Sequence, residues 1–237
     1  MGAVDKLLSI ASGEVGYLEK KSESSLYDKT ANAGSSNYTK YGYEMHRLYP
    51  ATMDYPAAWC DCFVDWCFVQ AFGKEMAAKL LHKFDDYTVN SSGYYKNNKQ
   101  WYNTPKVGDQ IFFTNSKGGI CHTGLVYKVD GLNVYTIEGN TSSSSGVVAN
   151  GGCVAKKSYK LNYNRIAGYG RPNYGLIKED KEMLESGNDI IWELMNGKHK
   201  VEILEVDKAV KALDKAKNTP DFASLYWILY KLVNYNV

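Results

Sequence analysis

The fold of this chain is decided by the stretch Ala58-Trp59-Cys60-Asp61-Cys62-Phe63-Val64-Asp65-Trp66-Cys67-Phe68. It follows a proline-containing extended segment, and its apolar residues recur at the spacing of one helix face. That face continues to Phe72, and Gly73 is a natural helix stop. Cys60 is therefore expected at or just before the helix start, where unpaired N–H groups and the positive end of the helix dipole favour a thiolate. Thiolates are the nucleophiles of cysteine hydrolases.

The composition excludes several classes of protein. Hydrophobic residues make up 44% of the 237 residues, which is ample for a core, and the formal net charge is +2. A nucleic-acid-binding protein would show a basic stripe, so we expect no nucleic-acid partner. No stretch approaches the roughly 20 apolar residues of a membrane span, so we expect none. The mild positive charge would help approach to an anionic cell wall or membrane surface.

The N-terminus and the cysteines bear on the cellular compartment. Asp5 and Lys6 lie where a signal peptide would need an unbroken apolar run. We therefore expect no signal peptide, with synthesis and folding in the cytoplasm. The chain has 5 cysteines, an odd number that suits reduced thiols better than a complete disulfide framework.

Helical and strand patterns follow one another along the chain. A short amphipathic helix is expected over residues 4–18, and the segment 22–58 is rich in loop residues. Apolar runs bounded by turn residues predict strands over residues 110–113, 125–129, 132–137 and 159–169. Helices followed by antiparallel strands define an α+β fold.

The composition changes near Tyr174. Beyond it Lys, Glu and Asp dominate, strand signals vanish, and apolar residues recur at helical spacing. We predict a first domain over residues 1–174, a linker over 175–185 and an all-α three-helix unit over 186–237. A unit of that size is marginally stable alone, so we expect it to pack on the first domain or to self-associate.

Two further motifs supply the residue types that cysteine catalysis needs. His122 stands at the start of a predicted strand after a glycine-rich approach, and Glu138 and Asn140 end the next strand. A nucleophilic cysteine needs a base near its sulfur and a third group that orients the base. Cys60, His122 and either Glu138 or Asn140 are the candidates.

The register of the predicted hairpin decides whether these groups can meet. A two-residue turn would put Glu138 on the face opposite His122. A three-residue loop over 129–131 pairs Lys128 with Leu132 and places His122 directly across from Glu138. We predict the three-residue loop or an equivalent bulge.

The other cysteines offer alternatives. Cys62 competes with Cys60 as the nucleophile, and we prefer Cys60 because it stands earlier at the helix end. Cys67 lies on the apolar face and is expected in the core. A zinc site needs well-spaced ligand pairs, and Cys121 and His122 are adjacent, so we predict no metal.

These motifs resemble the CHAP family of cysteine, histidine-dependent amidohydrolases/peptidases. The resemblance covers roughly residues 1–174, and it rests on Trp59-Cys60-Asp61-Cys62-Phe63-Val64-Asp65-Trp66, Gly108-Asp109-Gln110-Ile111-Phe112-Phe113, His122-Thr123-Gly124-Leu125-Val126 and Glu138-Gly139-Asn140-Thr141. It implies a papain-like α+β fold in which N-terminal helices pack on an antiparallel sheet. It also implies hydrolysis of peptidoglycan at an amide of the stem or cross-bridge peptides or at the sugar–peptide junction.

The resemblance implies a role for each motif residue. Cys60 would be the nucleophile, His122 the base, Glu138 the orienting acid and Asn140 a further polar support. Trp59, beside the nucleophile, is expected to wall the substrate groove.

Some members of the family carry an Asp-rich calcium loop just before the cysteine. Residues 53–58 lack that density, so we predict neither calcium nor another cofactor.

The helical C-terminal unit and the expected lack of a signal peptide resemble phage endolysins, whose second domain commonly binds the cell wall. We therefore expect a bacteriophage endolysin, either an N-acetylmuramoyl-L-alanine amidase or a peptidoglycan endopeptidase, that acts on the wall. Residues 186–237 would bind the wall or form homo-oligomers. The alternatives are a wall-binding or assembly protein with an inactive cysteine domain, and a cysteine protease or effector toxin acting on protein.

Overall fold

The computed structural model describes residues 2–177. Contacts within the chain divide it into two units, residues 1–174 and 175–237. The predicted three-helix unit over 186–237 lies outside the described residues, as does the predicted linker beyond residue 177. Within residues 2–177, no helix combines the length and the apolar character needed to cross a membrane.

Helices come first along the chain and strands follow. The helices are α1 (Ala3–Gly13), α2 (Lys40–Leu48), α3 (Cys60–Leu81) and α4 (Thr88–Asn97). The strands are β1 (Trp101–Tyr102), β2 (Gln110–Thr114), β3 (Ile120–Val129), β4 (Asn133–Thr141), β5 (Cys153–Lys160) and β6 (Ile166–Gly170). They form one antiparallel sheet in the order β1-β6-β2-β3-β4-β5, so the fold is α+β.

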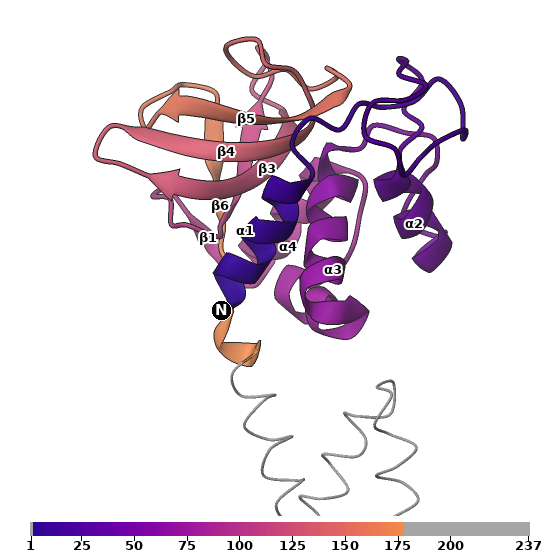
Figure 1. Cartoon of the computed structure of the whole chain (residues 1–237). Helices are drawn as coiled ribbons and strands as arrows, with labels where there is room; N and C mark the ends of the chain where they lie inside the picture. The colour runs from indigo at the N-terminus through magenta and orange to yellow at the C-terminus, as the bar shows by residue number, and fades with distance from the viewer. Residues whose placement is uncertain (1, 178–237) are drawn as a thin grey trace, which may run out of the picture. The chain divides into compact units, whose positions relative to one another are not determined.

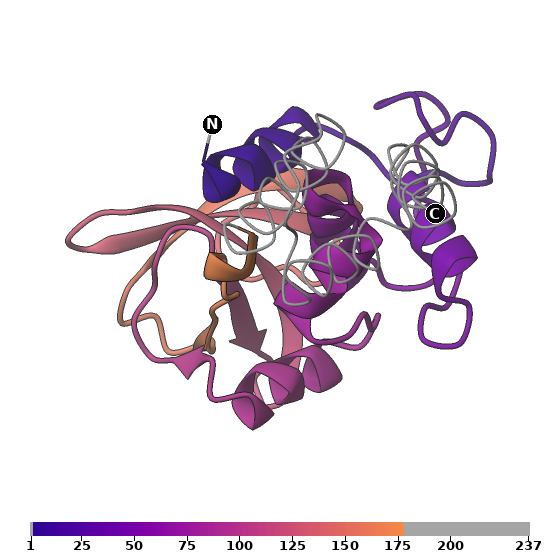
Figure 2. The ribbon, with the colours of Figure 1, turned by 90° about the horizontal axis from the view of Figure 1, so that it is seen from below.

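The helices gather on one side of the sheet (Figure 1). α3 is central, because it contacts α1, α2, α4, β3 and β4. α2 lies farthest from the sheet, and the tip of the β3–β4 hairpin projects away from the helices (Figures 1 and 2). This arrangement brings the first turn of α3 against the middle strands.

Two helices differ from the sequence pattern. α1 ends at Gly13 rather than at residue 18. α2 lies inside the segment predicted to be loops, where the Thr39 hydroxyl accepts the N–H of Gly42 at 3.1 Å and caps the helix. Tyr41 and Met45 bury its inner face. Gly42 and the tyrosines beside it have low helix propensity, so the local sequence does not predict this helix, and tertiary packing stabilises it instead.

α3 begins at Cys60, as the sequence predicts. Its apolar face is buried through Phe63, Cys67 and Phe68. The expected stop at Gly73 is a break rather than an end: Gly73 has a φ of 74°, and helical residues resume and continue to Leu81. The left-handed conformation of Gly73 explains the choice of glycine at this break.

The two faces of the sheet have different partners. A Cβ on Gly139 would lie 2.5 Å from the Phe63 side chain and 3.0 Å from Trp59, so β4 approaches α3 closely on that face. The opposite face carries a second core cluster of Ile111, Phe113, Val126, Val134, Tyr159 and Tyr169. Because side chains alternate along a strand, Glu138 belongs to this second face.

The β3–β4 loop differs from the predicted one. Val129 is the last paired residue of β3, and its partner is Val134. The Asp130 carboxylate accepts the backbone N–H of Leu132 at 3.0 Å, which is the hydrogen bond of an Asx-turn. This turn holds a longer loop, so the predicted pairing of Lys128 with Leu132 is wrong.

A β-bulge restores the shared face that the predicted site needs. The pairing shifts by one residue between Val126 and Lys128, beyond which Val126 pairs with Thr136. In the continued register Gly124 lies opposite Glu138, and a Cβ on Gly124 would sit 2.5 Å from Cγ of Glu138. The predicted bulge is therefore present and places His122 and Glu138 on one face, but the predicted position of His122 directly across from Glu138 is wrong, because Gly124 occupies it.

Candidate active site

Cys60 is the first residue of α3, and only 5% of it is exposed. Burial raises the pKa of its thiol well above the usual value, and the negative charge of Asp61 adds to the effect. Hydrogen bonds from the backbone N–H groups of Asp61 and Thr123 act in the opposite direction and lower the pKa. The sequence argument for a thiolate at the helix start is therefore wrong for the closed site, because desolvation outweighs the helix terminus.

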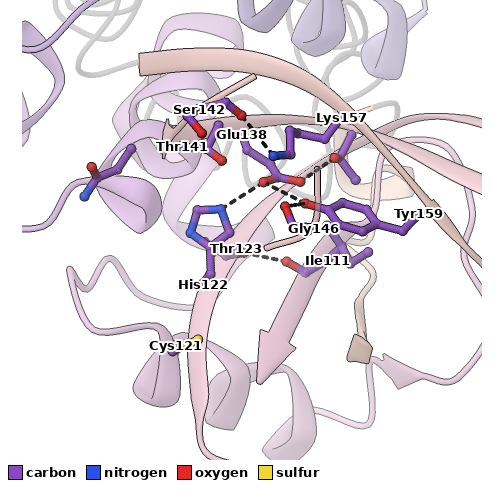
Figure 3. A network of polar contacts seen from close by, with 12 residues as sticks. Ile111, Cys121, His122, Thr123, Glu138, Thr141, Ser142, Gly146, Lys157 and Tyr159 are labelled. Carbon is purple, nitrogen blue, oxygen red and sulfur yellow. Dashed lines mark hydrogen bonds and ion pairs between the residues drawn. The ribbon is translucent and has the colours of Figure 1, made fainter. Parts of the chain in front are cut away.

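His122 and Glu138 form a buried pair. Nε2 of His122 lies 2.9 Å from Oε2 of Glu138, and both side chains are 0% exposed (Figure 3). The His122 ring also stacks on Phe113, with ring centroids 5.9 Å apart. Gly124 lies on the same strand face as His122 and opposite Glu138, so its missing side chain leaves the space through which Glu138 reaches the imidazole.

The thiol and the imidazole are held on neighbouring elements. The Thr123 N–H that points to the Cys60 sulfur belongs to the residue directly after His122. Nδ1 of His122 is buried and has no hydrogen-bond partner within the described part of the chain. The two groups are thus not hydrogen-bonded in this structure, and such bonds often tighten only when substrate binds.

The Glu138 carboxylate has two further neighbours that the sequence patterns do not single out. The Thr136 hydroxyl donates to Oε1 at 2.5 Å. The Tyr159 hydroxyl points to the carboxylate in Figure 3 and lies 3.3 Å from Oε2. Thr136 is two residues before Glu138 on the same strand face, so alternation alone could have found it. Tyr159 comes from β5, whose pairing with β4 is not readable from local sequence.

Asn140 lies near the pair without joining it. Its φ is 52°, a left-handed conformation that asparagine tolerates better than most residues. Its Oδ1 accepts the backbone N–H of Gly152 at 3.3 Å, and its Nδ2 is buried with no partner among residues 2–177. Asn140 therefore makes no hydrogen bond to His122 or Glu138 in this structure.

Trp59 is a core residue here, and its expected place in a substrate groove is wrong. Its side chain is 0% exposed, and its Nε1–H donates to Oε2 of Glu19 at 2.9 Å. The indole stacks on Tyr41, with centroids 5.4 Å apart and planes inclined by 24°. Glu19, the acceptor, lies 40 residues earlier in the chain. The position of Trp59 next to Cys60 in the sequence therefore does not indicate that its side chain is buried against a distant segment.

The other cysteines are engaged elsewhere. The Cys62 sulfur lies 3.7 Å from the sulfur of Met53, and Cys67 is completely buried in the core. Cys121 is partly exposed and lies apart from the His122–Glu138 pair (Figure 3). In the part of the chain that the structure describes, no group of three or more His, Cys, Asp or Glu side chains is placed to hold a metal ion.

A buried polar network ties the start of α3 to the sheet. The Asp61 carboxylate accepts the Ser91 hydroxyl at 2.6 Å and Nε2 of Gln110 at 2.9 Å. The same Gln110 nitrogen lies 3.1 Å from Oγ1 of Thr123, which in turn donates to the carbonyl of Ile111 at 2.7 Å. Burial raises the pKa of Asp61 to about 7, although the bonds from Ser91 and Gln110 oppose the rise. The network fixes Thr123 beside the Cys60 sulfur.

Comparison with known proteins supports a CHAP-domain protein. Residues 50–140 match the model of the CHAP domain family, and the helices and antiparallel sheet are consistent with that fold. CHAP domains are typically cysteine- and histidine-dependent amidohydrolases or peptidases.

The remaining comparisons add little. None of the curated protein sequences matches this chain. A solved structure described as "The crystal structure of Ly7917" is similar with 15% sequence identity and a TM-score of 0.33. The similarity covers 72% of this chain and 62% of the other, so the chain spans less than two thirds of that protein.

Proposed function

We propose that the chain is a peptidoglycan hydrolase of the endolysin type, which cleaves an amide bond of the bacterial wall peptide through Cys60, His122 and Glu138. The observation that carries this proposal is the buried 2.9 Å contact between Nε2 of His122 and Glu138. Because Nε2 faces Glu138, Nδ1 of the same ring is free to act as a base. The next residue of the strand, Thr123, directs its backbone N–H to the Cys60 sulfur.

The contact between His122 and Glu138 sets the tautomer. A carboxylate accepts the Nε2 proton, so the neutral imidazole carries its lone pair on Nδ1. In the proposed reaction Nδ1 takes the Cys60 proton as the sulfur bonds to the amide carbonyl carbon. The backbone N–H groups at the start of α3 stabilise the oxyanion. The imidazolium then protonates the leaving amine as the C–N bond breaks, and water hydrolyses the thioester.

Replacement of Cys60 tests this function. Purified full-length Cys60→Ala protein is expected to release no free amines from Gram-positive walls and to leave their turbidity unchanged. Cys62→Ala is the matched control, because Cys62 lies on the same turn of α3 as Cys60 and its sulfur contacts Met53. Both variants should keep the circular dichroism of the wild type. Amine release by Cys60→Ala, or loss of release in Cys62→Ala alone, would reject the assignment.

The bond that is cleaved distinguishes the two enzyme classes. An N-acetylmuramoyl-L-alanine amidase frees the N-terminal amine of the stem peptide, whereas an endopeptidase frees an amine within the stem or cross-bridge. Mass spectrometry of the fragments released by the wild type identifies that amine directly.

The closed site favours one alternative, a wall-binding protein without catalytic activity. The thiol is almost inaccessible and the imidazole is completely buried, so substrate access requires the site to open. Pelleting of the full chain with walls, with no amine release above the Cys60→Ala background, would support binding alone. Comparison with residues 1–174 tests whether residues 186–237 bind the wall, as the sequence predicts.

A further inference from the structure

We propose that Thr136 and Tyr159 are positioning residues, whose hydroxyl groups hold the Glu138 carboxylate in the orientation that directs His122 toward the thiol. The inference deepens the proposed function and rests on it for its kinetic consequences. It adds two residues on β4 and β5 that none of the sequence motifs contains.

Thr136 fixes one oxygen of the carboxylate. Its hydroxyl donates to Oε1 at 2.5 Å, a short distance typical of a hydrogen bond to a charged acceptor. Oε2 is thereby left facing His122, at 2.9 Å from Nε2. Both Thr136 and Glu138 are completely buried, so water does not compete for either oxygen.

Tyr159 approaches the other oxygen. Its hydroxyl lies 3.3 Å from Oε2 of Glu138 and 3.4 Å from the carbonyl of Gly146, so its single proton is shared between the two acceptors (Figure 3). Burial, and then the charge of Glu138, raise the pKa of the phenol well above its usual value. Tyr159 is consequently a neutral donor throughout the physiological range. Its ring packs on Phe113, with centroids 4.7 Å apart.

A carboxylate that accepts from three donors has little freedom to rotate. Rotation of Glu138 would break the bond from Thr136 and the bond from His122 together, so the two bonds reinforce each other. The same donors stabilise the negative charge that the imidazolium needs as its partner during the reaction. A merely structural role would instead lower stability without a specific effect on turnover.

Single hydroxyl deletions separate these roles. Thr136→Val and Tyr159→Phe should each lower kcat on dye-labelled walls by about tenfold, the effect of one lost hydrogen bond to a charged group, with little change in KM. Thr136→Ser keeps the hydroxyl group and should therefore have the kcat of the wild type.

Tyr169→Phe is the matched control. Tyr169 belongs to the same buried cluster as Tyr159, but its hydroxyl has no hydrogen-bond partner among the described residues. Its replacement should leave kcat and KM unchanged. If Thr136→Val and Tyr159→Phe behave like Tyr169→Phe while Cys60→Ala is inactive, the positioning role is overturned and the proposed function stands.

A spectroscopic readout makes the test independent of turnover. In full-length protein the Nε2 proton of His122 should give a downfield resonance, because it is bonded to a buried carboxylate. Thr136→Val and Tyr159→Phe should shift this resonance and speed its exchange with solvent, whereas Tyr169→Phe should not. An unchanged resonance in both deletion variants would overturn the inference, even if the wild type released no amines.

Discussion

Replacing Gly124 by alanine should disable the site without touching any of its polar atoms. A Cβ at this position would lie 2.5 Å from Cγ of Glu138 and 2.9 Å from the backbone oxygen of Ile137. Carbon atoms in contact are normally about 3.5–4.0 Å apart, so Cγ must retreat by about 1 Å. The Ile137 oxygen belongs to the paired strand, so its 2.9 Å contact is relieved only by a small separation of the two strands, and the larger displacement falls on the Glu138 side chain.

The expected loss follows from that displacement. Glu138 is held 2.9 Å from His122, and a misplacement of about 1 Å in a catalytic group costs about 100-fold in rate. Overpacking at the same position should lower the free energy of unfolding by about 1–3 kcal/mol. Gly124→Ala should therefore fold but release amines from walls about 100-fold more slowly than the wild type.

The assay compares two glycines of one hairpin. A Cβ on Gly131 would meet no atom within 4 Å, so Gly131→Ala is the control for the effect of a methyl group on the hairpin itself. Amine release is measured for both variants at a temperature where thermal unfolding shows each to be folded. If Gly124→Ala is as active as Gly131→Ala, Glu138 does not orient His122 across Gly124 and the account of the site is refuted.

Three changes elsewhere test the energetics of the domain. Burial raises the pKa of Asp61 from 3.8 to about 7. Between about pH 4 and pH 7 the folded state therefore binds a proton that the unfolded state releases, so the free energy of unfolding falls as pH rises. Urea unfolding across this range should show a smaller fall in the Asp61→Asn variant. Trp59→Phe removes the donor to Glu19 and should cost about 2 kcal/mol in urea unfolding, while kcat of the folded fraction stays unchanged. Arg171→Met breaks the bidentate pair with the buried Asp109, formed by two bonds of 2.9 Å, and should lower the free energy of unfolding by about 3 kcal/mol.

The parts of the fold that sequence reasoning predicted are those with a local pattern. The apolar face after Cys60 places the start of α3 correctly, because helical spacing is readable within a few turns. The strand after Asp109 and the hairpin around Asp130 are likewise found where turn residues bound apolar runs. α2 was missed because its stability comes from burying Tyr41 and Met45 against other elements, which no window of local sequence contains.

The details of the site depend on contacts between distant residues. The register of β3 and β4 is set jointly by the Asp130 turn and by the bulge at Tyr127. The alternation of side chains along a strand could predict which residues share a face, but not which residues pair. The donors on Glu138 include Tyr159 from a strand whose register is also non-local. The acceptor for Trp59 comes from a segment far earlier in the chain, and that contact makes the indole a core group.

The raised pKa of Cys60 changes how the proposed catalyst must work. A helix terminus favours a thiolate only where solvent or a counter-ion shares the charge, and burial removes the solvent here. The compensating charge must then come from an imidazolium at His122. That cation is itself buried, so the carboxylate of Glu138 has to stabilise it. Ionisation of the sulfur is therefore coupled to the orientation of a carboxylate on the far side of the imidazole, and to the hydroxyl groups that hold it. In the proposed mechanism, residues that never approach the substrate thus influence the nucleophile through their hydrogen bonds to Glu138 and its bond to His122.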